Sequence, residues 1–201
     1  YTDGSRTVET VTSETTSPVQ AAGVNTLPFF GNTQPGIGAI YADIDRITTT
    51  ELQPDGKIII GGQINNQGNN LDFALVRLNK NGSIDNSFGA NGRAIIDIEN
   101  SSNDFATSLT IQPDGKMVLG GYSITLRDGT YTSDYSIVRL NSNGSLDNSF
   151  NSNGKSIVNV KGAADYATRL LLQPDGKLIL SGHSGNSFSQ ISSSPNWFAS
   201  F

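Results

Sequence analysis

The polar residues with the spacing of a cation site lie in two Asn- and Gly-containing segments of this 201-residue chain. They are Asn79, Asn81, Ser83 and Asp85 in the first segment, and Asn141, Asn143, Ser145 and Asp147 in the second. Alternating oxygen ligands around a glycine are typical of a Ca²⁺ loop. Each segment has a single carboxylate, however, and Arg77 would repel a cation. Asn-Gly hairpin turns account for the same residues, so the sequence favours no metal and no other cofactor, with calcium as the alternative.

The only histidine is His183, which stands between Ser181 and Ser184 in a polar segment. A serine nucleophile needs a base that is itself oriented by a carboxylate, and the residues around His183 do not show that arrangement. The chain has no cysteine, which excludes thiolate catalysis and zinc-thiolate sites. We therefore expect no enzymatic activity, and a hydrolase that uses His183 is the third of three hypotheses.

Acidic residues recur at matched places, whereas catalytic carboxylates need surroundings that differ from one another. We interpret the recurring acids as caps of turns or as partners of Arg77 and Arg139 within the fold. The acids concerned are Asp45, Asp104, Asp165, Asp85 and Asp147.

Aromatic side chains in polar loops would suit a carbohydrate ligand. Tyr131 and Phe188 lie in segments that we predict to be loops. Tyr135 and Trp197 occupy the place that Phe73 has in an earlier copy of the same pattern, and we predict that they belong to the core. Glycan binding is therefore the second hypothesis.

An internal repeat sets the elements that position these residues. The pattern Gln-Pro-Asp-Gly-Lys occurs three times, at intervals of 59 and 61 residues, and an aspartate precedes each Gln by eight residues. A second pattern, Asp-Phe-Ala-Leu-Val-Arg-Leu-Asn in its first copy, returns at intervals of 62 residues. The copies are 53–57, 112–116 and 173–177 for the first pattern, and 72–79, 134–141 and, in weakened form, 196–201 for the second.

Within each unit the patterning indicates strands joined by tight turns. Pro, Asp and Gly in this order suit a type I turn with a bulge, so residues 47–53 and 57–62 are predicted to pair antiparallel. Residues 72–79 predict a third strand and residues 93–98 a fourth, with 155–160 as its second copy. Residues 63–71 and 123–133 are predicted to be polar loops. The chain is therefore predicted to be all-β, a β-propeller-like array of about three four-stranded antiparallel blades that is incomplete as a closed ring.

These repeated residues resemble the delta-60 repeat over residues 30–201. The resemblance rests on Leu-Gln-Pro-Asp-Gly-Lys before an aliphatic run and Gly-Gly, on Asp-Phe-Ala-Leu-Val-Arg-Leu-Asn, and on Asn-Gly-Ser-Ile-Asp-Asn-Ser-Phe-Gly. It implies a propeller-like β fold in large secreted or surface-attached bacterial proteins, with no catalytic residues to transfer. Ser181 departs from the pattern, because it replaces the first glycine of Gly-Gly.

The repeat spacing divides the chain into an N-terminal segment and three units. Residues 1–29, rich in Ser and Thr, are predicted to form a linker or an arm that adds a strand to a neighbouring subunit. Residues 30–44 match a lone fourth strand, followed by blades at 45–103, 104–164 and 165–201, the last without its fourth strand. Because closed propellers have four to eight blades, we expect either self-association, in which two copies would supply six blades, or a longer chain.

The net charge and the hydropathy of the chain argue against two kinds of partner, nucleic acid and the interior of a membrane. A net charge of −5 gives no electrostatic footprint for nucleic acid, and no apolar run approaches the roughly 18 residues of a membrane span. Regular repeats without a catalytic constellation favour a non-catalytic structural or adhesive module of an extracellular bacterial surface or filament. A glycan-binding propeller module is the alternative.

Overall fold

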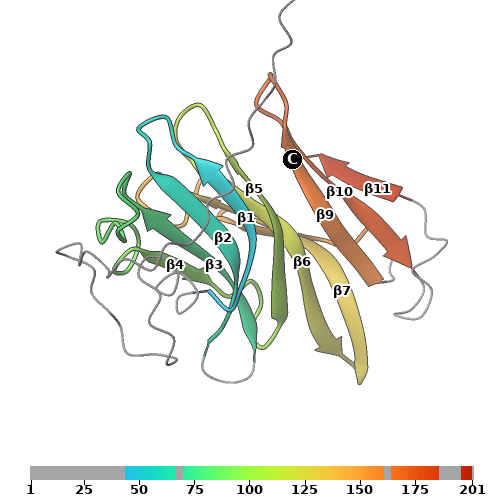
Figure 1. The fold of residues 1–201 in the computed structure, drawn as a ribbon. Coiled ribbons are helices and arrows are strands. Elements are labelled where there is room, and N and C mark those ends of the chain that lie inside the picture. The colour runs from blue at the N-terminus through green and yellow to red at the C-terminus, as the bar shows by residue number, and fades with distance from the viewer. Residues whose placement is uncertain (1–43, 67–69, 161–163, 186–195, 201) are drawn as a thin grey trace, which may run out of the picture.

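The computed structural model describes residues 44–66, 70–160, 164–185 and 196–200, and these residues form eleven strands and no helix (Figure 1). No described segment is therefore a helix long and apolar enough to cross a membrane. The N-terminal arm and the lone fourth strand predicted at residues 30–44 lie outside the described residues, apart from Ile44, which is buried.

The strands form three separate antiparallel sheets, and each follows the order of the chain. The first sheet contains β1 (Arg46–Leu52), β2 (Ile58–Asn65), β3 (Leu71–Leu78) and β4 (Arg93–Ile96). The second contains β5 (Asn103–Ile111), β6 (Met117–Arg127), β7 (Thr130–Leu140) and β8 (Lys155–Val158). The third contains β9 (Ala164–Leu172), β10 (Leu178–Gly185) and β11 (Asn196–Ser200). The predicted meander is confirmed.

The Gln-Pro-Asp-Gly segments form the tight turns between the first two strands of each sheet. In the first copy, the Gly56 N–H donates to the Gln53 carbonyl and the Gln53 N–H donates to the Lys57 carbonyl, both at 2.8 Å. Gly56 has a φ of +80°, a conformation that glycine adopts at no steric cost. The same bonds recur in the other two copies, which confirms the turn predicted from Pro, Asp and Gly.

The prediction of a polar loop over residues 123–133 is wrong. β6 and β7 continue to Arg127 and Thr130, and only Asp128 and Gly129 lie between them. Both have a positive φ, 50° and 77°, as a two-residue type I′ hairpin requires. The strands extend because Ile124-Thr125-Leu126 and Tyr131-Thr132 are good strand formers on either side of this Asp-Gly turn.

The predicted fourth strands are also two residues too long. β4 ends at Ile96 and β8 at Val158. Beyond Ile96 the chain turns toward the next sheet, where the Ile98 N–H donates to Asp104 of β5 at 2.8 Å. The Ile98 N–H, which a longer β4 would use to pair with β3, thus donates to the neighbouring sheet instead.

The core lies between the sheets, which pack face to face (Figure 1). Ile59, Phe73 and Leu75 of the first sheet form one buried cluster with residues of the second sheet, among them Leu109 and Leu119. The opposite face of the second sheet packs on the third through another cluster, Val118, Tyr135, Ile137, Ala167, Leu178 and Leu180. Each fully buried aliphatic side chain contributes about 1.5–3 kcal/mol, so the sheets stabilise one another.

Candidate functional site

The polar residues gather at the two ends of the strands. The turns between the first and second strands of each sheet lie at one end, together with the connections β3–β4 and β7–β8. The connections β2–β3, β4–β5 and β6–β7 lie at the other end. We call the first the turn end and the second the loop end.

At the turn end, Asp85 accepts hydrogen bonds on both carboxylate oxygens. Arg77 Nε donates to Oδ2 at 2.7 Å and Lys57 Nζ donates to it at 2.8 Å. The Ser87 hydroxyl donates to Oδ1 at 2.6 Å. These donors, Lys57 first and Ser87 next, hold the pKa of Asp85 well below its usual range. Of the two roles predicted for the recurring acids, turn cap or arginine partner, Asp85 has the second, because it pairs with Arg77.

The second sheet repeats this arrangement residue for residue. Arg139 Nε donates to Asp147 at 2.7 Å, and Lys116 lies 3.0 Å from the same carboxylate. Hydrogen bonds from Ser149 are the largest cause that lowers the pKa of Asp147. Each guanidinium also lies 4.8 Å from the ring centre of a phenylalanine, Phe88 or Phe150. The ordered set Arg, Asp, Ser and Phe is therefore a structural unit of the repeat.

The oxygen atoms considered for calcium have donors from the protein. The Ser83 N–H and hydroxyl donate to Asn81 Oδ1 at 3.1 and 2.7 Å. The corresponding bonds to Asn143 come from Ser145 at 3.0 and 2.8 Å. The amides of Asn79 and Asn141 donate in turn to the hydroxyls of Ser83 and Ser145. These bonds support the interpretation of both segments as hairpin turns.

At the loop end, three carboxyl groups meet at the junction of the first and second sheets. Asp72 of β3, Asp97 after β4 and Asp104 of β5 each have an oxygen within 4.8 Å of the others. Among the described residues this is the one cluster of three acidic side chains that lie so close together. We assign no metal to it, because Asp72 and Asp104 already accept hydrogen bonds from N–H and O–H groups. Burial raises the pKa of Asp104 to about 6 and, as the largest cause, raises the pKa of Asp97.

The next junction, between the second and third sheets, has an amide in place of one carboxyl. Asn159 Nδ2 donates to Asp134 Oδ1 at 2.7 Å. The Val160 N–H donates to Asp165 at 2.7 Å, as the Ile98 N–H does to Asp104. The prediction that Asp104 and Asp165 cap turns is thereby confirmed. Asp45 has a different partner, because it accepts from the N–H of Asn65 at the end of β2 in its own sheet.

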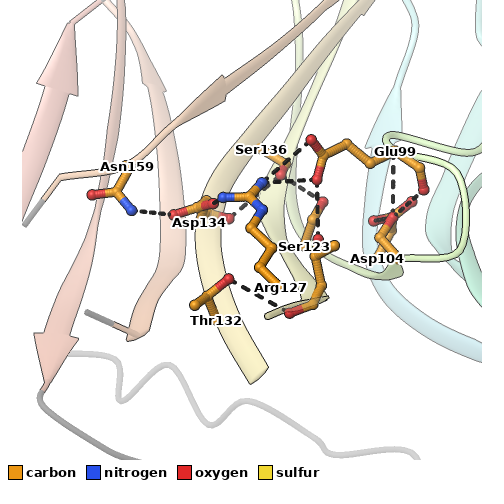
Figure 2. A network of polar contacts seen from close by, with 10 residues as sticks. Glu99, Asp104, Ser123, Arg127, Thr132, Asp134, Ser136 and Asn159 are labelled. Carbon is orange, nitrogen blue, oxygen red and sulfur yellow. Dashed lines mark hydrogen bonds and ion pairs between the residues drawn. The ribbon is translucent and has the colours of Figure 1, made fainter. Parts of the chain in front are cut away.

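Arg127 lies at the centre of the polar network in Figure 2. Its guanidinium donates to Asp134 at 2.9 Å and to Glu99 at 3.0 Å, and Thr125 donates to the same Glu99 carboxylate. A pocket of about 450 Å³ opens here, lined by Ile98, Glu99, Asn100, Thr125 and Arg127. Sequence reasoning missed these residues because it placed Arg127 in a loop rather than near the tip of a hairpin.

His183 packs against an aromatic ring. Its ring centre lies 5.2 Å from that of Tyr166 at an interplanar angle of 27°, and Tyr166 contacts Tyr122 edge to face. The residue paired with His183 on each side is Tyr166 or Asn196, not a carboxylate. Such a place in a row of rings supports the interpretation of His183 as a packing residue.

The other predicted aromatic residues divide between core and surface. Tyr135 is fully buried, as predicted. Tyr131 is 62% exposed, although it lies in a strand rather than a loop. Phe188 and the side chain of Trp197 lie outside the described residues.

Three stacked antiparallel meanders define an incomplete β-propeller-like fold. A family model described as a domain of unknown function (DUF5122) beta-propeller matches residues 53–88 and 112–150. These two segments each run from a Gln-Pro-Asp-Gly turn to the phenylalanine beneath the arginine, so the match falls on the repeat itself. A comparison with curated proteins finds no match.

Proposed function

We propose that this chain is a non-catalytic structural or adhesive module of an extracellular bacterial surface or filament protein, built from delta-60 repeats. The observation that carries the proposal is that the recurring polar residues bind other parts of the repeat. Arg77, for example, donates to Asp85 of its own sheet and to the Ser142 carbonyl of the next sheet at 2.7 Å. Residues committed to such bonds join blades into a rigid array.

The outer face of the third sheet has partly exposed apolar side chains, and this supports association with further blades. Ile59 and Val118 occupy the same repeat position, and both are fully buried against the following sheet. Ile179 has that position in the third sheet and is only partly buried, while Leu171 beside it is 59% exposed. Exposed apolar faces of this kind favour association. A second copy of the chain, or the remainder of a longer repeat chain, is the proposed partner.

The absence of catalysis can be tested with His183→Ala. We expect the wild-type chain and this variant to give the same rate as buffer on a broad panel of esters and glycosides, because His183 stacks on Tyr166 and, within the described strands, pairs with Tyr166 and Asn196 rather than with a carboxylate. A spectrophotometric assay of each substrate measures this. Turnover by the wild type that His183→Ala abolishes, with an unchanged melting curve, would contradict the proposal.

Glycan binding is the second candidate, and the pocket beside Arg127 favours it. This pocket combines donors and acceptors from Arg127, Glu99 and Thr125, and Tyr131 is exposed on the same hairpin. A glycan array probed with the labelled chain separates the two candidates. No bound glycan from a protein that forms ordered oligomers supports the structural role. Binding that Arg127→Ala and Tyr131→Ala both remove supports glycan recognition.

A further inference from the structure

The two junctions between sheets differ in one functional group. Phe73 pairs with Ile96, and Tyr135 pairs with Val158 at the same repeat position. The residue that follows each fourth strand is therefore equivalent in the two sheets. It is Asp97 at the first junction and Asn159 at the second.

At the second junction the amide joins two strands by a hydrogen bond. Asn159 donates from Nδ2 to Asp134 Oδ1 over 2.7 Å, and both residues are drawn in Figure 2. Asp134 is the repeat equivalent of Asp72. An asparagine amide and a protonated aspartic acid have nearly the same shape, and each can donate one such bond.

At the first junction, the donors are unequally distributed among the carboxyl groups. Asp104 accepts from the Ile98 N–H at 2.8 Å and from the Ser102 hydroxyl at 2.7 Å. Asp72 accepts from the Asn66 side-chain amide at 2.8 Å. Within the described part of the chain, Asp97 Oδ1 is buried and has no hydrogen-bond partner. Among these three carboxyl groups, Asp97 is thus the one with a buried oxygen that lacks a donor.

The charged groups around Asp97 are predominantly negative. Asp72 from β3, Asp104 from β5 and Glu99 from the β4–β5 connection face it. Lys155 of β8 is the cation beside it, and its ammonium donates to the main-chain carbonyl of Asp97. Arg127 is bound to Glu99 and Asp134 instead. Two buried carboxylates and a partly buried one this close repel one another unless a proton or a cation lies between them.

We propose that Asp97 holds a proton in the folded protein and donates it to Asp72, as Asn159 donates to Asp134, so that acid strengthens the contact between β3 and the segment after β4 at the first junction. As the pH rises, the proton leaves Asp97 and the hydrogen bond is replaced by repulsion between two carboxylates. The hydrogen bond at the first junction therefore depends on pH, whereas the one at the second junction does not, because the Asn159 amide does not titrate.

The sign of the pH dependence follows from the raised pKa values at this junction. Burial, followed by the charge of Asp72, raises the pKa of Asp97, and burial raises that of Asp104 to about 6. A carboxyl whose pKa is higher in the folded state contributes stability that is fully present below its unfolded value of about 3.9. That contribution is lost as the pH rises through the folded value, so the loss begins near pH 4 and passes through about 6.

The test is Asp97→Asn, which gives the first junction the same amide that Asn159 provides at the second. At about pH 7.5 we expect the melting temperature to rise by about 3 °C, and near pH 4.5 we expect little change. Asp97 is one of the causes that raise the pKa of Asp104, so the difference between their melting-temperature curves reports the titration of Asp97 together with its effect on Asp104. Carbon-13 NMR of the Asp97 carboxyl measures its titration directly, and its midpoint is expected above the ordinary range.

The mirror variant Asn159→Asp provides the matched control. It should lower the melting temperature by about 3 °C near pH 7.5 and recover it in mild acid. Parallel pH curves for the wild type and Asp97→Asn, or an ordinary carboxyl midpoint for Asp97, would overturn the proposal even if Asn159→Asp does not fold. A rise in melting temperature with millimolar Ca²⁺ that the wild type shows and Asp97→Asn lacks would also overturn it, because a cation would then occupy the place of the proton.

Discussion

Replacement of Gly121 by alanine is expected to cost about 3 kcal/mol or more of the free energy of unfolding. A Cβ atom at this position would lie 1.9 Å from the carbonyl oxygen of Phe105, a backbone atom of the paired strand. The backbone of β5 is fixed by its ladder with β6 and cannot move aside without breaking those bonds. Urea denaturation followed by circular dichroism measures the loss.

The neighbouring Gly120 supplies the control for this substitution. A Cβ atom there would meet Leu180 Cδ1 at 2.8 Å, and that atom is the end of a flexible side chain. The third copy of the repeat has Ser181 at the same position, so the strand backbone there accommodates a Cβ atom. We expect Gly120→Ala to cost much less than Gly121→Ala, and equal losses would contradict this account of the Gly-Gly pair.

Replacement of Arg77 by methionine is expected to destabilise the fold by about 3 kcal/mol, because it removes one of the two cations that bind the buried carboxylate of Asp85 and leaves only Lys57. Methionine retains much of the packing of the arginine side chain over Phe88 but removes the bonds to Asp85 and to the Ser142 carbonyl. The second of these joins two sheets. The midpoint of urea denaturation should therefore fall. The backbone amide hydrogens of the third strands, β3 and β7, should exchange with solvent faster.

Arg139→Met is the matched control, since Arg139 donates to the equivalent aspartate and serine in the second sheet but, among the described residues, has no counterpart of the bond from Arg77 to the Ser142 carbonyl. Its side chain is 20% exposed, compared with 9% for Arg77, and exposed ion pairs contribute less than buried ones. We expect less than half the shift in denaturation midpoint that Arg77→Met causes. A larger effect of Arg139→Met would show that the bond between sheets contributes little.

Local chemistry made much of the fold predictable. Pro, Asp and Gly at fixed spacing determine the turn after β1, β5 and β9, because each residue suits one backbone conformation of that turn. Repetition then did what a single copy could not, since it indicated that the recurring acids cap turns or pair with Arg77 and Arg139. In the structure Asp85 and Asp147 each pair with the arginine eight residues earlier. The family match on residues 53–88 and 112–150 falls on the same recurring residues.

The remaining features depend on contacts that no local pattern encodes. The carboxyl cluster joins Asp72 and Asp104 across two sheets, and its members are 32 positions apart in the chain. A signal was nevertheless present, because Asp97 and Asn159 occupy one repeat position with different chemistry. The β6–β7 hairpin was missed for a different reason. Its polar composition outweighed the Asp128-Gly129 turn signal, although strand formers flank that turn.

Light scattering of the purified 201-residue chain tests the central claim most directly, namely that each blade buries its faces against other blades. Because Ile179 and Leu171 leave the outer face of the third sheet partly uncovered, we predict particles of at least twice the chain mass of 21.3 kDa. A folded, cooperatively melting monomer of 21.3 kDa that stays monomeric at high concentration would contradict the account.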